Sequence, residues 1–212
     1  MKIAIIGAGA VGSSLGTAWA RGEHDIVFGV RDVNKAALKT LCKDIGASAL
    51  PGPEAAAIGD VVVLALPWDG AEASIKALGN LSGKTVIDCT NPLGFDDGAL
   101  FLDRGFTTSG GETVASWLPR ANVVKGLNQV PAEMMSDNAR LSGQPVQFIA
   151  GDDRSAKATA KALIEELGFE VLDSGALVQS RILEPLGMVF INQAIMRGMG
   201  RDWAFGILRN RD

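Results

Sequence analysis

A glycine-rich turn directly behind a short apolar segment constrains the fold more than any other feature of this sequence. The segment Ile3-Ala4-Ile5-Ile6 is rich in β-branched residues and too short for a helix, so it predicts a buried strand. The next residues, Gly7-Ala8-Gly9-Ala10-Val11-Gly12, match the G-x-G-x-x-G pattern of dinucleotide-binding turns. A helix over residues 13–20, ended by Gly22, and a strand over residues 25–30 complete a βαβ unit. Because of this context, we interpret the match as a nucleotide site rather than a fortuitous turn.

Each glycine of this turn has its own expected role. Gly7 would permit the tight turn, Gly9 would let the backbone approach a pyrophosphate, and Gly12 would allow the helix to pack closely on the strand. The pyrophosphate would bind unpaired N–H groups at the positive end of the helix dipole. We therefore predict that residues 7–12 hold the diphosphate of a dinucleotide.

Charged residues at the end of the second predicted strand bear on which dinucleotide binds. An acidic side chain at this position would bind the ribose 2′-OH of NAD, whereas an arginine accommodates the 2′-phosphate of NADP. Arg31 is nearest the strand end and Lys35 adds a second cation, while Asp32 opposes the phosphate in part. The pattern favours NADP over NAD, and the alternative is a merely solvated helix start.

Charge and composition exclude several classes of partner. The 212-residue chain is 47% hydrophobic and 21% charged, as expected of an α/β protein with a substantial core. Its net charge of −4 offers no basic surface, so nucleic acid and anionic membranes are poor partners. No apolar stretch is long enough to span a bilayer.

Few residues suit metal or acid–base chemistry. Cys42 and Cys89 are far apart in sequence and form no metal-binding or redox spacing, so we expect reduced, buried thiols in a cytoplasmic protein. His24 is the only histidine, which excludes multi-histidine metal sites, and no metal site is predicted. Tyrosine is absent, so no Tyr-Lys proton relay exists.

The rest of the chain alternates between strand and helix patterns. Strands are expected over residues 60–66, 85–89, 122–126, 146–150 and 169–172, and helices over residues 34–45, 54–58 and 71–78. Residues 47–53 are expected to be a connector, Ser109 with Glu112 to form a capping box, and Asp153 to cap a further helix. The alternation predicts a Rossmann-type, doubly wound, mostly parallel sheet over residues 1–174.

The carboxyl-terminal residues 175–212 follow a different pattern and predict a small helical segment packed on the main domain. Apolar residues from Ile182 to Met199 are too numerous for one helical stripe, and the pair Gly198/Gly200 would end the helix. We expect a helix over residues 180–199 that is covered on more than one side. Core packing and contact with a second copy in a homodimer are the favoured explanations.

Several of these segments together resemble the deazaflavin-dependent NADP oxidoreductases, which exchange hydride between NADP(H) and coenzyme F420. They also resemble the related cytoplasmic NADPH-binding domain of the transmembrane metalloreductases. The matching segments cover nearly the whole chain and comprise residues 7–12, 29–31 with Lys35, 64–68, 123–131, 151–153 and 180–184. The turn Leu66-Pro67-Trp68 and the stretch from Ser180 to Glu184 are more particular to this family than the glycine turn.

The resemblance implies roles for individual residues. The glycine turn, with Ala8, Ala10 and Val11, would cradle the pyrophosphate, and Arg31 with Lys35 would hold the 2′-phosphate. The remaining cofactor-binding residues would be Val30, Leu66, Pro67, Trp68 and Asn91, of which Leu66 and Pro67 lie against the nicotinamide side. This chain departs from the family in having Val30 where members carry Ser or Thr, Asp32 where they often carry a second arginine, and Asn128 where archaeal members carry a histidine.

The expected reaction is direct hydride transfer between NADPH and a deazaflavin or flavin-like ring, which needs little from side chains beyond positioning. Four polar residues would bind or orient the acceptor: Asn128, Gln129, Ser180 and Arg181. One alternative is a β-hydroxyacid-type carbonyl or imine reductase with Lys125 as proton donor beside Asn128. Another is a non-catalytic NADP(H)-binding sensor.

Overall fold

The apolar segment at the amino end forms β1, a central strand of an eight-stranded sheet in the computed structural model, which describes residues 1–210. The strand order is β10-β9-β8-β5-β4-β1-β2-β3, and every neighbouring pair is parallel except β8 and β9. The strands are β1 (Lys2–Ile6), β2 (Asp25–Val30), β3 (Ser48–Pro51), β4 (Val61–Leu64), β5 (Thr85–Asp88), β8 (Asn122–Lys125), β9 (Val146–Gly151) and β10 (Glu170–Asp173). From β3 to β8 this is the doubly wound Rossmann order, with the switch point between β1 and β4.

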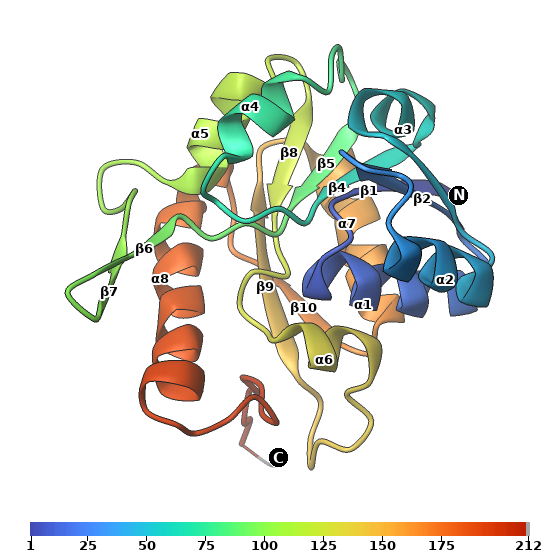
Figure 1. The fold of residues 1–212 in the computed structure, drawn as a ribbon. Helices are drawn as coiled ribbons and strands as arrows, with labels where there is room; N and C mark the ends of the chain where they lie inside the picture. The colour runs from blue at the N-terminus through green and yellow to red at the C-terminus, as the bar shows by residue number, and fades with distance from the viewer. Residues whose placement is uncertain (211–212) are drawn as a thin grey trace.

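Helices cover both faces of the sheet (Figure 1). One face packs on α1 (Ala10–Arg21), α2 (Ala36–Ile45), α6 (Ala132–Ser136) and α7 (Arg154–Glu166). The other face packs on α3 (Gly52–Ile58), α4 (Ala71–Lys76) and α5 (Gly110–Trp117). Since a parallel sheet is buried on both faces, its strands need continuous apolar runs, and all four residues of β4 are buried.

The sequence-based prediction of the fold class is confirmed, and the two predicted helix caps are present. Ser109 accepts a hydrogen bond from the Glu112 backbone N–H, and its hydroxyl donates to the Glu112 carboxylate at 2.7 Å. Asp153 accepts from the Ala156 backbone N–H at 2.8 Å and so caps α7. Gly46 ends α2 in the left-handed conformation.

Four short elements were not predicted. The expected connector at residues 47–53 contains β3 at the sheet edge and the start of α3. A hairpin of β6 (Leu93–Asp96) and β7 (Ala99–Leu102) and the one-turn helix α6 were also missed. Each has at most five residues, too few for a periodic pattern to become visible, and each is stabilised by tertiary or hairpin pairing.

The predicted helix over residues 180–199 is wrong in its extent. It consists of α8 (Ser180–Ile191), followed by a π-helical turn over Asn192–Met196. The chain then folds back, so that Trp203 packs between Phe190 and Phe205 and the Val146 N–H donates to the Phe205 carbonyl at 2.8 Å. The predicted division into a main domain (residues 1–174) and a carboxyl-terminal segment (residues 175–212) stays a prediction. Residues 211 and 212 of that segment lie outside the described part of the chain. None of the helices among residues 1–210 is long and apolar enough to cross a membrane.

Candidate functional site

The glycine turn leads from β1 into α1 at the switch point of the sheet. Gly7 has a φ of +106°, a conformation that favours glycine, and its N–H donates to the Gly29 carbonyl at 2.9 Å. The Ser13 hydroxyl donates to the Ala8 carbonyl at 3.2 Å and ties the turn to the first turn of α1. The turn is therefore held by one hydrogen bond to β2 and one from α1.

The surroundings of the three glycines separate their roles. A Cβ at Gly7 would lie 2.4 Å from the Ala65 carbonyl oxygen, and one at Gly12 would lie 2.0 Å from the Gly7 carbonyl oxygen. A Cβ at Gly9 would meet nothing within 4 Å. Gly7 and Gly12 are thus required by packing within the protein, whereas Gly9 borders open space. This agrees with the expected roles, in which only Gly9 makes room for a ligand.

The amino end of α1 has free hydrogen-bond donors. Its N-cap is Gly9, with no side-chain cap and no acidic residue in the first turn. The first bond from the cap runs from the Ser13 N–H to the Gly9 carbonyl, so the N–H groups of residues 10–12 have no acceptor within the helix. By contrast, side chains cap α5 and α7. Open space at Gly9 beside bare amides at a helix dipole fits a pyrophosphate.

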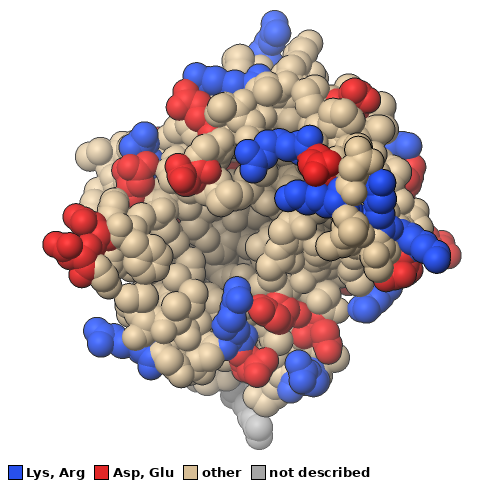
Figure 2. Space-filling model, viewed as in Figure 1, with Lys and Arg blue, Asp and Glu red and all other residues tan. Residues whose placement is uncertain are grey.

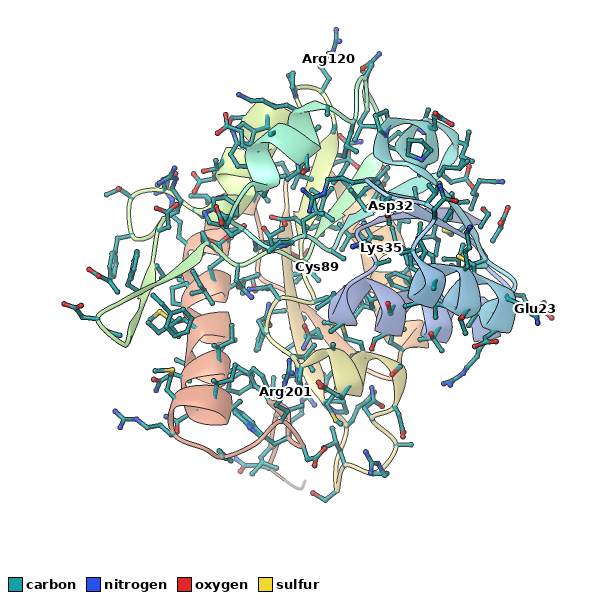
Figure 3. All side chains as sticks on the ribbon, in the orientation of Figure 1. Glu23, Asp32, Lys35, Cys89, Arg120 and Arg201 are labelled. Carbon is teal, nitrogen blue, oxygen red and sulfur yellow. The ribbon has the colours of Figure 1, made fainter. Side chains whose placement is uncertain are left out.

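The cations predicted to bind a 2′-phosphate stand near this turn. Arg31, Asp32 and Lys35 are exposed where β2 ends, and Asp32 accepts a hydrogen bond from the Asn34 backbone N–H at 2.9 Å. Figure 2 shows a hollow on the face where the glycine turn lies, between α1 and α8. Figure 3 places Asp32 and Lys35 on one side of this region and Arg201 on another. Lys35 therefore stands beside the hollow, on the side of the glycine turn.

The turn after β4 contributes less to the cleft than predicted. Leu66 is half-buried and Pro67 is exposed, so both remain candidates for cofactor contact. The indole of Trp68 instead stacks on Trp117 with ring centroids 5.6 Å apart, and its Nε1–H donates to Asp103 at 2.9 Å. Because these contacts direct Trp68 toward α5 and the hairpin, its predicted cofactor contact has no support here.

Two predicted site residues from different strand ends form one amide pair. Asn91 Nδ2 donates to the Asn128 carbonyl at 2.8 Å, and Asn128 Nδ2 donates to Asn91 Oδ1 at 3.0 Å and to the Leu183 carbonyl at 3.0 Å. Asn91 is half-buried and Asn128 is buried. The structure thus brings the ends of β5 and β8 together with α8.

Two of the other three predicted acceptor residues have side-chain hydrogen-bond partners within the protein. Gln129 is buried and uses its amide on both backbone groups of Phe148. Ser180 is buried against Gly111, where a Cβ would lie 2.4 Å from the Ser180 hydroxyl. Arg181 makes a bidentate pair with Glu112, and hydrogen bonds from Arg181 and Ser109 hold the pKa of Glu112 below its ordinary value against the effect of burial. These contacts occupy the side chains of Gln129 and Arg181, whereas the buried Ser180 hydroxyl has no hydrogen-bond partner among the described residues. The acceptor roles of all three residues stay predictions.

Lys125 is fully buried, and its ammonium group contacts two carboxylates of the same chain. It lies 2.9 Å from Asp88 and 2.9 Å from Glu184. Burial would lower the pKa of Lys125, but the two carboxylates outweigh it, so the pKa stands above its ordinary value and the group stays charged. A lysine so held cannot approach a substrate, which argues against the proton-donor hypothesis.

Sequence reasoning missed the partners of Lys125. Asp88 and Thr90 were seen only as the end of a strand, and Glu184 only as part of a family stretch. A buried lysine that ends an apolar strand was the one available signal, since such a charge requires partners.

The same region contains Cys89, whose thiol pKa is raised by burial and, to a smaller degree, by the charge of Asp88. This buried thiol is neutral and unreactive. Cys42, by contrast, is only partly buried, contrary to prediction.

A doubly wound sheet whose first strand turns through glycines into an uncapped helix defines a Rossmann-type dinucleotide-binding protein. Residues 2–92 match the family model described as NADP oxidoreductase, coenzyme F420-dependent. The chain is 31% identical over 208 residues to the F420-dependent NADP reductase of Methanocaldococcus jannaschii, covering 90% of this chain and 91% of that one. It therefore belongs to the F420-dependent NADP reductase family and is an NADP oxidoreductase.

Two further comparisons agree with this membership. The F420-dependent NADP reductase of Methanothermobacter thermautotrophicus is 29% identical over 210 residues, covering 91% of this chain and 88% of the relative. A crystal structure from Arthrobacter sp. FB24, described as a candidate F420-dependent NADP reductase, superposes with a TM-score of 0.91 at 32% identity. It covers 99% of this chain and 100% of that one. The likeness therefore includes the carboxyl-terminal segment.

Proposed function

We propose that this protein transfers hydride directly between NADP(H) and coenzyme F420 or a closely related deazaflavin. The observation that carries the proposal is the open space at Gly9 beside the bare amides of α1, in a chain similar over nearly its whole length to reductases named for both cofactors. When bound, the nicotinamide would supply the hydride and the deazaflavin ring would accept it.

The tasks left to the protein are binding, orientation and exclusion of water. The amides of residues 10–12 would hold the pyrophosphate, and Arg31 and Lys35 would hold the 2′-phosphate. Leu66 and Pro67 would contact the nicotinamide side. The Asn91–Asn128 amide pair, fixed by its own hydrogen bonds, would set the floor for the acceptor ring.

Anaerobic mixing of the pure protein with NADPH and oxidised F420 tests the proposal. We expect stoichiometric loss of the visible absorbance of the oxidised deazaflavin, with deuterium passing directly from C4-labelled NADPH to the ring. Riboflavin and a ferric chelate serve as comparison acceptors, and faster reduction of either would assign the acceptor differently. NADPH binding without turnover on any of them would instead support a non-catalytic sensor.

The carbonyl or imine reductase hypothesis has less support from the geometry. It requires Lys125 to donate a proton to a substrate, yet the Nζ of Lys125 is buried among Asp88, Thr90 and Glu184. Reduction of cyclic imines or short 2-oxo acids by NADPH would nevertheless revive it, and the same spectrophotometric assay measures that reduction.

We also propose a homodimer through the outer face of α8. Two apolar side chains there are strongly exposed, Ile182 at 59% and Val189 at 48%. Ile195 in the following π-helical turn is 58% exposed, and Phe95 in the adjacent hairpin is 60% exposed. A monomer rarely leaves so many large apolar groups on one face. A second copy is the partner we infer, since a C2 interface is the commonest way to cover such a face.

Replacing Ile182 and Val189 by glutamate is expected to convert the dimer to monomers, because each buried charge without a partner costs several kcal/mol (about 3). Sedimentation equilibrium measures the change. The matched control is Ile58→Glu, which alters an apolar side chain 48% exposed on α3, away from α8. A monomeric wild type at micromolar concentration would contradict the proposed dimer.

We also propose that the protein is cytoplasmic. Its support is the state of the two cysteines, since Cys42 and Cys89 are both free thiols and the cytosol keeps thiols reduced. Fractionation of the native organism with an antibody to the chain measures it.

A further inference from the structure

The ammonium group of Lys125 joins three segments that reach the carboxyl edge of the sheet. Asp88 and Thr90 come from the end of β5, Lys125 ends β8, and Glu184 lies on α8. The Nζ atom lies 2.9 Å from Asp88 Oδ2 and 2.9 Å from Glu184 Oε1, and it donates to the Thr90 carbonyl at 2.6 Å. All three donors of the ammonium are therefore used by protein groups.

The two carboxylates are also satisfied on their other sides. Asp88 Oδ1 accepts from the Thr90 N–H at 2.9 Å and from the Thr90 hydroxyl at 2.7 Å. Glu184 accepts from the N–H groups of Gly110 at 2.8 Å and Gly111 at 2.9 Å, which open α5. The second negative charge is thus balanced by the dipole of α5. A fully satisfied network of this kind fixes one arrangement of the segments that carry it.

The same segments carry the Asn91–Asn128 amide pair. Asn91 directly follows the β5 end that Lys125 holds, and Asn128 donates to the Leu183 carbonyl of α8 at 3.0 Å. A Cβ at Gly187, one turn beyond Glu184, would lie 2.6 Å from the Asn128 carbonyl oxygen. Glu184 and Gly187 therefore fix the position of α8 relative to the amide pair.

The turn between Lys125 and Asn128 is strained and needs such support. Leu127 has a φ of +59°, although it is a bulky residue and is 1% exposed. A non-glycine residue in this region is strained and persists only where the surroundings enforce it. The ion pairs of Lys125 at the start of the turn and the side-chain hydrogen bonds of Asn128 at its end supply that constraint.

We propose that Lys125 is the positioning residue of the acceptor half of the cleft. Its ammonium ties α8 to the ends of β5 and β8 and so sets the separation between α8 and the Asn91–Asn128 pair. The inference rests on the proposed function, because the acceptor is placed against that pair. It assigns Lys125 no contact with substrate and no proton transfer.

Lys125→Met tests the inference, and Lys84→Met is the matched control. The Lys84 ammonium also has three acceptors, the carbonyls of Ala56, Ala57 and Gly59, but it lies at the amino end of β5. We expect Lys125→Met to raise the KM for F420, or to lower kcat/KM, by about tenfold or more while the Kd for NADPH changes less than about twofold. Lys84→Met should lower the melting temperature and leave both constants unchanged. Equal effects of the two variants would reduce Lys125 to a purely structural residue and overturn the inference.

A second variant keeps the test decisive if the first does not fold. If Lys125→Met does not fold, the double variant with Asp88→Asn removes one charge of each sign and leaves Glu184 on the α5 amides. If neither folds while Lys84→Met does, Lys125 serves the whole fold and the inference fails.

Amide hydrogen exchange decides the role independently of turnover. Faster exchange at residues 126–130 and 183–188 in Lys125→Met than in Lys84→Met supports the inference, and equal exchange overturns it. A wild type that leaves F420 unreduced would defeat the proposed function alone, because the exchange comparison would still stand.

Discussion

Replacing Gly9 by valine is expected to abolish most NADPH binding while leaving the fold intact. Gly9 has an extended backbone with φ −80° and ψ −165°, which a β-branched residue adopts readily, and its Cβ direction meets nothing within 4 Å. The added side chain would occupy the space next to the free amides of α1. Loss of two charge-assisted hydrogen bonds to a pyrophosphate costs about 3 kcal/mol, so Kd should rise about 100-fold or more.

Isothermal titration with NADPH measures this effect, and thermal unfolding checks the fold. The stability of Gly9→Val should lie within about 1 kcal/mol of the wild type, since valine is only a poorer N-cap than glycine. Gly12→Ala is the contrasting control, because its Cβ would lie 2.0 Å from the Gly7 carbonyl oxygen, a backbone atom that cannot move freely. It should destabilise the protein by about 3 kcal/mol. Unchanged NADPH affinity in folded Gly9→Val would place the cofactor elsewhere.

Removing the two cations at the end of β2 should change the cofactor preference. With Arg31→Ser and Lys35→Ala combined, we expect the Kd for NADPH to rise about 100-fold and the Kd for NADH to change less than about threefold. A phosphate held by an arginine and a lysine gains about 1.5–3 kcal/mol per charge-assisted bond, and NADH has no such phosphate. Asp32, freed from competing cations, would then favour the ribose hydroxyl of NADH.

Parallel titrations of both cofactors at two salt concentrations measure the change. The matched control is Lys43→Ala, which removes an exposed charge near the far end of α2 and should leave the NADPH/NADH ratio unaltered. The loss should be smaller at high salt, because exposed charges are screened. An equal loss for both cofactors would mean that these residues act on parts of the dinucleotide other than the 2′-phosphate.

The local structure of the proposed nucleotide site was largely predictable, because its signals are local. The strand, glycine turn and helix follow one another within residues 2–21, and each glycine role reflects short-range backbone contacts. Capping by Ser109 and Asp153 was predictable for the same reason, since a cap depends on residues three positions apart. Only the direction of Trp68 was unpredictable there, because Trp117 and Asp103 are distant in sequence.

The contacts of the predicted acceptor residues could not be predicted, because their partners are distant in sequence. From the sequence, Ser180, Arg181 and Gln129 were polar groups available to a ligand. In the folded chain Gly111 covers Ser180, Glu112 pairs with Arg181, and the backbone of Phe148 uses the amide of Gln129. The contact between Asn128 and Asn91 was likewise not predicted from the sequence.

The sequence by itself determined the doubly wound fold, the glycine turn and the positions of the cations at the end of β2. These follow from periodicity and from backbone conformations that a few neighbouring residues dictate. The tertiary structure alone decided that Lys125 is a buried ion-pair centre, that Glu184 accepts from the first amides of α5, and that α8 ends at Ile191 with its outer apolar face exposed. A buried charge acquires its meaning from the groups that replace water around it, and those groups are brought together only when the chain folds.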